Sequence, residues 1–318
     1  MRGRPLIALL VLICCACAQQ PAQAPRGAFS FGLIGDLPYL PREEQTLRDL
    51  IAEMNAQPLA FVAHDGDIKS GGSRCDDEVL FWNKQVFDSS RHPFIYVPGD
   101  NEWTDCHRAS NGGFDPIERL ARLREVFFPD DQSLGRQRLT LTRQSADPRY
   151  SAYRENVRWV IGNVMFVGVN VPGSNNNFGR TATADAEYRA RNAADLEWLR
   201  QAFDAVRRER LLGIAIIMQA DPFFELPRGH KDRRGFEDLL ALLQSETAAL
   251  GKAVLLVHGD THFFRVDQPL LDSSGHKLAN FTRLETFGSP ALGWVRVSVD
   301  PADAKLFVIE PFKYAPRQ

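Results

Sequence analysis

Short apolar runs rich in β-branched residues recur along the chain, and each predicts a buried strand. The six clearest are FSFGLIG, LAFVAHDG, PFIYVPG, WVIGNVMFVGVNV, LLGIAIIM and AVLLVHG, at residues 29–35, 59–66, 93–99, 159–171, 211–218 and 253–259. Four later runs follow one another through turns, without helices between them, at residues 263–270, 280–288, 293–300 and 305–312. This tail predicts an antiparallel portion, which would form a second sheet.

Apolar residues at helical spacing lie between many of the earlier runs and predict helices that pack on the sheet. The four stripes are Leu47, Leu50, Ile51 and Met54; Ile117, Leu120, Leu123 and Phe127; Leu196, Leu199, Phe203 and Val206; and Phe236, Leu239, Leu240 and Leu243. Strands that alternate with helices indicate an α/β fold. No linker divides the chain, so one domain is expected after the N-terminal segment.

Polar side chains follow five of the predicted strands at the point where each apolar run ends. They are Asp36, Asp67, Asp100, Gln219 and Asp260, the last followed closely by His262. A Gly-Asp step is common in ordinary turns, so one alone carries little weight. Four such steps, each directly after an apolar run, favour a shared site, because ligands bind at the carboxyl ends of strands in α/β sheets. Carboxylates that meet repel one another, and a divalent cation is the simplest compensation.

The order of these motifs resembles that of the calcineurin-like metallophosphoesterases. The matching segments are Asp36-Leu37-Pro38, Gly66-Asp67, Gly99-Asp100-Asn101-Glu102, Gln219 and Gly259-Asp260-Thr261-His262. The resemblance implies an α/β fold of four layers (αββα), a double β-sandwich, over residues 29–318. It also implies a metal site that hydrolyses a phosphoester through metal-activated water.

The resemblance assigns the metal ligands to Asp36, Asp67, Asp100, Gln219, Asp260 and His262, with Asp67 as the bridging carboxylate. The sequence departs from the family at several positions. Pro38, Gln219 and Asp260 stand where histidine ligands are expected, and Asp100 replaces an asparagine. Oxygen ligands favour Mn²⁺, Mg²⁺, Ca²⁺ or iron over Zn²⁺. One or two ions are expected.

The catalytic candidates are His258 and Asn101, and the substrate-binding candidates are Asn101, Glu102, Tyr39 and Asn175. Asn101 stands where the family has the histidine often assigned to protonating the leaving group. His258 is an alternative donor or a support for the ligands. His64 is a weaker candidate for the same role. For each histidine, the alternative is a ring held by backbone hydrogen bonds near a strand end.

The N-terminus predicts export. Its basic start MRGR, the apolar residues 6–13 and the small residues that follow are typical of a secretory signal over residues 1–18. Residues 19–28 predict a flexible leader. Cys15 or Cys17 is an alternative site for a lipid anchor, which leaves open a periplasmic or secreted protein or a membrane-anchored lipoprotein. The apolar run is too short to span a bilayer, so no membrane span is expected in the mature chain.

Beyond this segment only Cys75 and Cys106 remain, and an oxidising compartment favours a disulfide between them over two free thiols. The net charge of −2 over 318 residues provides no field that would attract nucleic acid. No phosphate-binding P-loop, Rossmann glycine motif or nucleophile elbow is present.

The sequence therefore predicts an exported metal-dependent phosphoesterase that acts on a small-molecule phosphoester. One alternative is a catalytically impaired protein of the same fold that binds metal or phosphate. A second is a structural role in which Ca²⁺ holds the loops.

Overall fold

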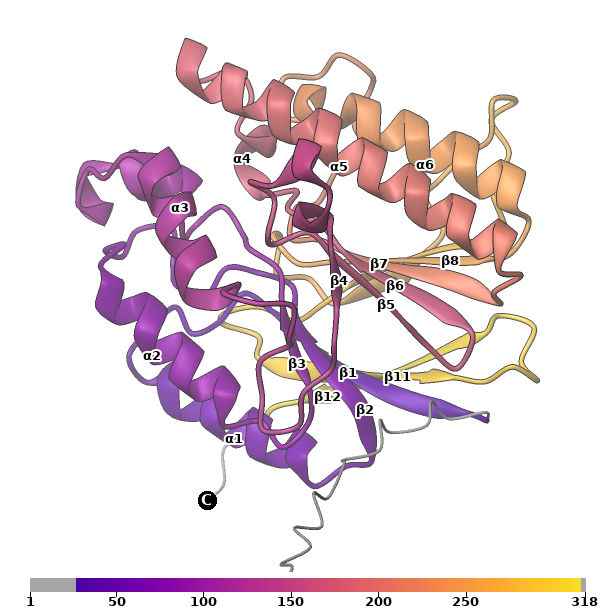
Figure 1. Ribbon diagram of the computed structural model, residues 1–318, viewed down its shortest axis with the longest axis horizontal. Helices are drawn as coiled ribbons and strands as arrows, with labels where there is room; N and C mark the ends of the chain where they lie inside the picture. The colour runs from indigo at the N-terminus through magenta and orange to yellow at the C-terminus, as the bar shows by residue number, and fades with distance from the viewer. Residues whose placement is uncertain (1–26, 316–318) are drawn as a thin grey trace, which may run out of the picture.

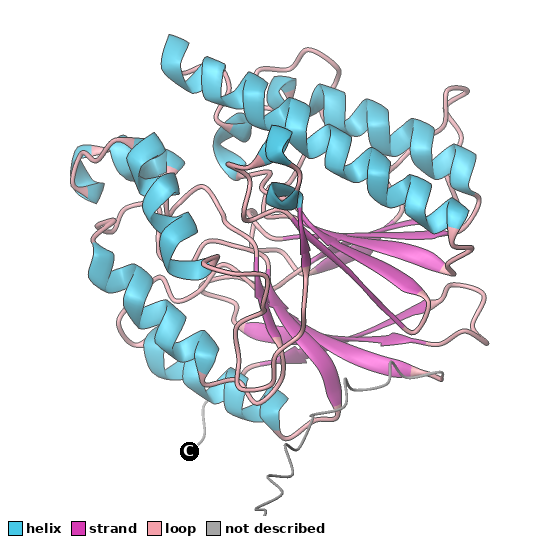
Figure 2. Cartoon of the chain, viewed as in Figure 1, coloured by secondary structure: helices cyan, strands magenta, loops and turns pink. Residues whose placement is uncertain are grey.

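The computed structural model describes residues 27–315 of the chain. The predicted signal segment 1–18 and most of the leader 19–28 lie outside these residues. Two β-sheets face each other, and helices cover both outer faces (Figures 1 and 2). The predicted α/β fold of four layers is therefore confirmed.

The first sheet has five strands in the order β12-β11-β1-β2-β3. They are β1 (Phe29–Ile34), β2 (Leu59–His64), β3 (Phe94–Tyr96), β11 (Gly293–Val299) and β12 (Phe307–Lys313). Strands β1, β2 and β3 are parallel, while β11 pairs antiparallel with both β1 and β12. The carboxyl ends of the three parallel strands therefore meet at one edge of this sheet.

The second sheet has seven strands in the order β4-β5-β6-β7-β8-β10-β9. They are β4 (Thr142–Arg143), β5 (Val157–Ile161), β6 (Val164–Gly168), β7 (Gly213–Ile217), β8 (Ala253–His258), β9 (Arg265–Asp267) and β10 (Phe281–Glu285). Strands β6, β7, β8 and β10 are parallel, and the flanking pairs are antiparallel.

Two predictions about the strands were wrong in detail. The run 159–171 does not form one strand, because the chain reverses at Gly162 and Asn163, whose φ angles are 55° and 63°, and β5 pairs antiparallel with β6. The C-terminal strands do not form a sheet of their own. Instead β9 and β10 extend the seven-stranded sheet, while β11 and β12 extend the five-stranded one.

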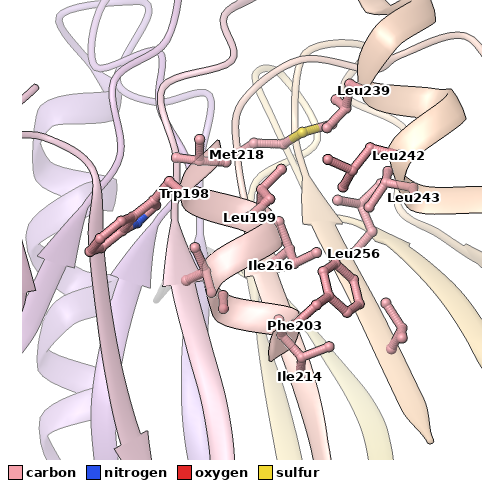
Figure 3. Close-up of a cluster of buried hydrophobic side chains, with 14 of the residues drawn as sticks. Trp198, Leu199, Phe203, Ile214, Ile216, Met218, Leu239, Leu242, Leu243 and Leu256 are labelled. Atoms are coloured by element: carbon pink, nitrogen blue, oxygen red, sulfur yellow. The ribbon is translucent and has the colours of Figure 1, made fainter. Parts of the chain in front are cut away.

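The outer layers are α1 (Glu43–Asn55), α2 (Asp77–Asp88) and α3 (Pro116–Phe127) on the five-stranded sheet, and α5 (Ala182–Arg208) and α6 (Glu237–Leu250) on the seven-stranded sheet. Figure 3 shows α5 and α6 packing leucine and phenylalanine side chains onto the second sheet. The shorter helices are α4 (Gly173–Asn176) and the 3-10 turns η1 (Thr104–His107), η2 (Ala109–Asn111), η3 (Gln144–Ala146), η4 (Pro148–Tyr150) and η5 (Arg234–Phe236). Within residues 27–315, no helix combines the length and apolar character needed to cross a membrane.

Aromatic rings fill the space between the two sheets. Phe166 of β6 packs edge-on against Phe31 and Phe61 of the opposite sheet, with ring centroids 5.2 and 4.9 Å apart, and stacks on Trp159 at 5.5 Å. All four side chains are buried. Such rings bury large apolar areas in defined geometries, so this core fixes how the two sheets, and the loops at their edges, lie relative to each other.

We expect Phe166→Ala to lower the free energy of unfolding by about 3–5 kcal/mol, because it leaves a cavity between the sheets that rigid neighbours cannot close. Urea unfolding with the disulfide intact would measure this loss. The matched control is Val160→Ala on β5, whose side chain is 41% exposed and should change stability little. Equal losses in both variants would contradict this role for Phe166.

Candidate metal centre

The predicted ligand residues follow the carboxyl ends of parallel strands in both sheets. Asp36, Asp67 and Asp100 follow β1, β2 and β3, whereas Gln219 follows β7 and the pair Asp260 and His262 follows β8. The two sheets meet directly at this edge, since the backbone N–H of Asp260 donates to both carboxylate oxygens of Asp36, at 3.2 and 3.1 Å.

Four of these residues have a left-handed backbone, which is uncommon outside glycine. Their φ angles are 52° for Asp36, 58° for Asp67, 80° for Asp260 and 65° for His262. Each such residue costs of the order of 1–3 kcal/mol, and it persists only where the surrounding structure imposes it. Strain that recurs at four predicted ligands points to a functional requirement at this edge of the sheets.

Glycines allow the motif loops to approach the carboxylates closely. A Cβ atom on Gly99 would lie 2.1 Å from Oδ1 of Asp67, and one on Gly259 would lie 2.1 Å from Oδ2 of Asp36. No side chain fits at either position. The Gly-Asp steps are thus needed for packing one motif against the next, which an ordinary turn does not require.

The hydroxyl of Tyr39 lies among these side chains. It is 3.2 Å from Oδ1 of Asp36, 3.0 Å from Oδ2 of Asp67 and 3.2 Å from Nε2 of His262. The side-chain amide of Asn101 donates to the Tyr39 oxygen at 3.1 Å and to Oδ2 of Asp67 at 2.7 Å. Tyr39 was predicted only as a substrate-binding candidate, and its central place was not apparent from the sequence.

Asp100 and Gln219 are held by the loop after β6, in which the sequence singled out only Asn175. The hydroxyl of Ser174 donates to Oδ2 of Asp100 at 2.5 Å, and the backbone N–H of Gly173 donates to Oε1 of Gln219 at 2.5 Å. Asp260 accepts the backbone N–H of Asp221 at 2.9 Å. Nε2 of Gln219 is buried and has no hydrogen-bond partner within the described residues.

The electrostatics of the group call for added positive charge. Burial, and then the charges of Asp100 and Glu102, raise the pKa of Asp67 well above its usual range. Burial, and then Asp100, do the same for the pKa of Asp260. Lys69 is a buried cation beside them, but its amine donates to the carbonyls of Ser70 and Asn101.

Buried carboxylates with raised pKa values, an imidazole and few nearby cations form the donor set that divalent metals take. The residues present therefore have the donor chemistry of such ions, although no three of their carboxylate or imidazole donors in residues 27–315 lie within 4.8 Å of one another.

Three other candidates do not face this group. Both polar atoms of the Asn175 amide have other partners. Its oxygen accepts the backbone N–H of Gly235 in η5, and its nitrogen donates to the carbonyl of Phe178. Oε1 of Glu102 accepts the N–H groups of Asp67 and Gly99 at 3.1 and 2.7 Å, so Glu102 orients the motif loops. The side chain of His258 forms no hydrogen bond or ion pair with the four motif aspartates anywhere in residues 27–315. These positions give no support to the predicted substrate-binding and catalytic roles.

His258 belongs to a second buried group on the helix side of the seven-stranded sheet. Donor atoms of Asp221, His258 and Glu285 lie within 4.8 Å of one another, which no other trio of His, Cys, Asp or Glu side chains achieves in the described part of the chain. Nη2 of Arg265 lies 2.7 Å from Asp221 and 2.6 Å from Glu285, so an arginine already supplies the positive charge there. Glu285 also accepts the hydroxyl of Thr261, which braces the loop between Asp260 and His262.

The predicted disulfide is present. Cys75 and Cys106 are joined, with Cα atoms 5.8 Å apart, and both residues are buried. Their sulfur atoms lie 3.6 and 3.8 Å from the carbonyl oxygen of Asn101. The bridge therefore packs directly behind the loop that carries Asp100 and Asn101.

No protein-family model matches the sequence, and no curated protein matches it. Among solved structures, the chain is similar to a dimetal phosphatase from Danio rerio, with a TM-score of 0.59 and 15% identity over 90% of this chain and 96% of that one. It is also similar to a purple acid phosphatase from yellow lupin (Lupinus luteus) seeds, with a TM-score of 0.52 and 12% identity over 92% of this chain and 55% of that one.

The chain has the fold of the calcineurin-like metallophosphoesterases. The fold implied by the motif resemblance is therefore confirmed. Identities this low show the fold alone. Any activity therefore depends on the side chains of the site itself.

The burial of His64 behind this site makes the free energy of unfolding depend on pH, and this dependence can be measured. Desolvation lowers the pKa of His64 to about 3, and its ring accepts the N–H of Gly66 and donates to the carbonyl of Leu37. Between pH 6.5 and 3 the unfolded chain binds a proton here that the folded chain does not, so this histidine lowers stability as the pH falls. From pH 7 to pH 5 the loss is about 2 kcal/mol.

We expect His64→Gln to remove that contribution, because glutamine cannot take up the proton. Urea unfolding at pH 7 and pH 5 should show wild type losing about 2 kcal/mol more than the variant over this interval. Parallel losses in the two proteins would show that His64 does not remain neutral in the folded state.

Proposed function

We propose that the chain is an exported metal-dependent phosphoesterase. One observation carries the proposal: acidic residues from both sheets gather at one edge with His262. Asp36, Asp67 and Asp100 are buried and Asp260 is half-buried, and no arginine or lysine side chain within residues 27–315 forms an ion pair with any of the four. In a fold shared with a dimetal phosphatase, this is the place and the chemistry expected of a cation-dependent hydrolytic site.

Asp67 would be shared between two groups of ligands. Asp36 and His262 lie on one side of it, connected through the Tyr39 hydroxyl. Asp100 and Asp260 lie on the other, where a Cβ on Gly173 would come within 3.0 Å of a carboxylate oxygen of each. Bound cations would supply Lewis-acid chemistry, lowering the pKa of water and neutralising phosphoryl oxygens.

The rest of the loops hold these ligands in orientation. The N–H and amide of Asn101 fix both oxygens of Asp67, at 3.1 and 2.7 Å. Ser174 fixes Asp100, and the N–H of Asp221 fixes Asp260. Carboxylates held in this way need little rearrangement when charge develops on a substrate, which is the basis of electrostatic catalysis.

A cavity of about 360 Å³ lies beside the site, and Tyr39 and Lys69 line it together with Leu40, Ile68 and Trp82. Its walls are mainly apolar, and its size suits a small molecule rather than a polymer. We therefore assign it to the organic part of a small-molecule phosphoester, either a monoester or a diester.

Export is supported by the buried disulfide, since such bridges persist in oxidising compartments. The basic and apolar N-terminal pattern points the same way. A periplasmic or secreted location fits both, and anchoring through Cys15 or Cys17 is the lipoprotein variant of the same proposal.

A second candidate is a protein that binds a cation or phosphate without turnover. The observation that favours it is the amide of Asn101, which donates hydrogen bonds to Asp67 and Tyr39 but is not acidic enough to transfer a proton to a leaving group. Measuring bound metal and hydrolysis on the same preparation separates the two, because only the enzyme turns over generic phosphoesters when loaded.

We expect Asp67→Asn to abolish phosphoesterase activity and to release bound metal, because the variant loses a charge shared by both groups of ligands. Elemental analysis and assays of phosphomonoesters and phosphodiesters with Mn²⁺, Mg²⁺ and Ca²⁺ would test this. Near-ultraviolet circular dichroism would establish that the variant is folded.

The matched control is Asp204→Asn on α5, whose carboxylate is exposed and paired with Arg207. It should retain metal and activity. An Asp67→Asn protein with wild-type metal content and turnover would place the active site elsewhere.

A further inference from the structure

We propose that Tyr39 is itself a metal ligand in this chain and takes the role of the donor that the first motif lacks at Pro38. The inference rests on the proposed metal-dependent function and deepens it. The sequence predicted that Tyr39 binds substrate; here its phenolic oxygen instead coordinates the cation directly.

The distances around that oxygen carry the argument. Ligands bound about 2.1 Å from one cation at right angles are about 3 Å from each other. The Tyr39 oxygen lies 3.2, 3.0 and 3.2 Å from donor atoms of Asp36, Asp67 and His262. Donor atoms of Asp36 and His262 are 3.5 Å apart, so these two and Tyr39 have the spacing of one ligand set, while Asp67 borders that set on the Tyr39 side.

The hydrogen bonds at this position cannot all be made by the tyrosine. A phenol has one proton, yet Asp36 and Asp67 both lie where they would accept it, and the amide of Asn101 already donates to the same oxygen. A cation among these atoms would satisfy the acceptors together. The carboxylates do accept other hydrogen bonds, from Asn101 and from the N–H of Asp260, but these come from neutral groups and add no positive charge.

The tyrosine is also held in place. Its backbone N–H donates to Oε2 of Glu43 at 2.8 Å, and Glu43 is buried and accepts the hydroxyl of Ser289 at 2.8 Å. Its ring packs edge-on against His262, with centroids 5.2 Å apart. Because backbone and ring are both fixed, a cation entering between Asp36 and His262 meets the phenolic oxygen rather than displacing it.

The test is Mn²⁺ binding to the full mature chain, measured by calorimetry and by electron paramagnetic resonance of free Mn²⁺. Tyr39→Phe should weaken binding tenfold or more, since it removes a donor and keeps the ring. Adding Mn²⁺ to wild type should also produce a tyrosine difference spectrum in the near ultraviolet that Tyr39→Phe lacks.

The matched control is Tyr314→Phe, which also removes a hydroxyl bonded to a carboxylate, that of Asp49 at 2.8 Å, far from the motif loops. It should bind Mn²⁺ as wild type does and keep the difference spectrum. Circular dichroism of all three proteins would show whether each is folded.

The outcomes separate the two proposals. If wild type binds Mn²⁺ and Tyr39→Phe binds it equally or more tightly, Tyr39 is not a ligand, and the phosphoesterase proposal stands. If Tyr39→Phe binds Mn²⁺ more weakly but Mn²⁺ produces no tyrosine difference spectrum in wild type, Tyr39 acts only by positioning Asp67, and the ligand role is refuted. If wild type binds no cation and hydrolyses no phosphoester, the proposed function itself fails.

Discussion

Mutual repulsion among buried carboxylates is the constraint on which the rest of this structure depends. Asp67 and Asp100 are buried and Asp260 is half-buried, and desolvation raises the pKa of each. Packed side chains alone do not stabilise such a group, because each ionised carboxylate loses its hydration. The core between the sheets, centred on Phe166, must therefore hold the two edges together against this repulsion.

The chain contains two buried acidic groups, and comparing them shows what is special about the first. Around Asp221 and Glu285, the guanidinium groups of Arg265 and Arg283 supply the opposing charge. Around Asp67, the nearest buried cation is Lys69, and its amine is bonded to backbone carbonyls. The second group is neutralised by arginines, whereas within residues 27–315 the motif aspartates have only His262 as an ion-pair partner, and this difference is the physical basis of the proposed metal site.

Buried groups behind the site hold the ligand-bearing loops in place. Glu285 and Arg265 brace the segment from Asp260 to His262 from behind, and the disulfide packs behind the loop of Asp100 and Asn101. The strained backbone of the ligand residues persists because these supports and the parallel strands leave it no alternative. Strain and repulsion are thus concentrated in a small region that the remainder of the fold makes rigid.

The sequence alone determined most of the strands, the amphipathic helices α1, α3, α5 and α6, and the acidic residues at the strand ends, because apolar periodicity and turn residues are local signals. The alternation of side chains along β8 also places His258 on the helix side of the sheet, opposite to Val257. Only the tertiary structure decided that the tail divides between two sheets, that Tyr39 lies among Asp36, Asp67 and His262, and that Ser174 reaches Asp100. These depend on which strands pair and on how loops distant in sequence pack, and no local pattern specifies such long-range contacts.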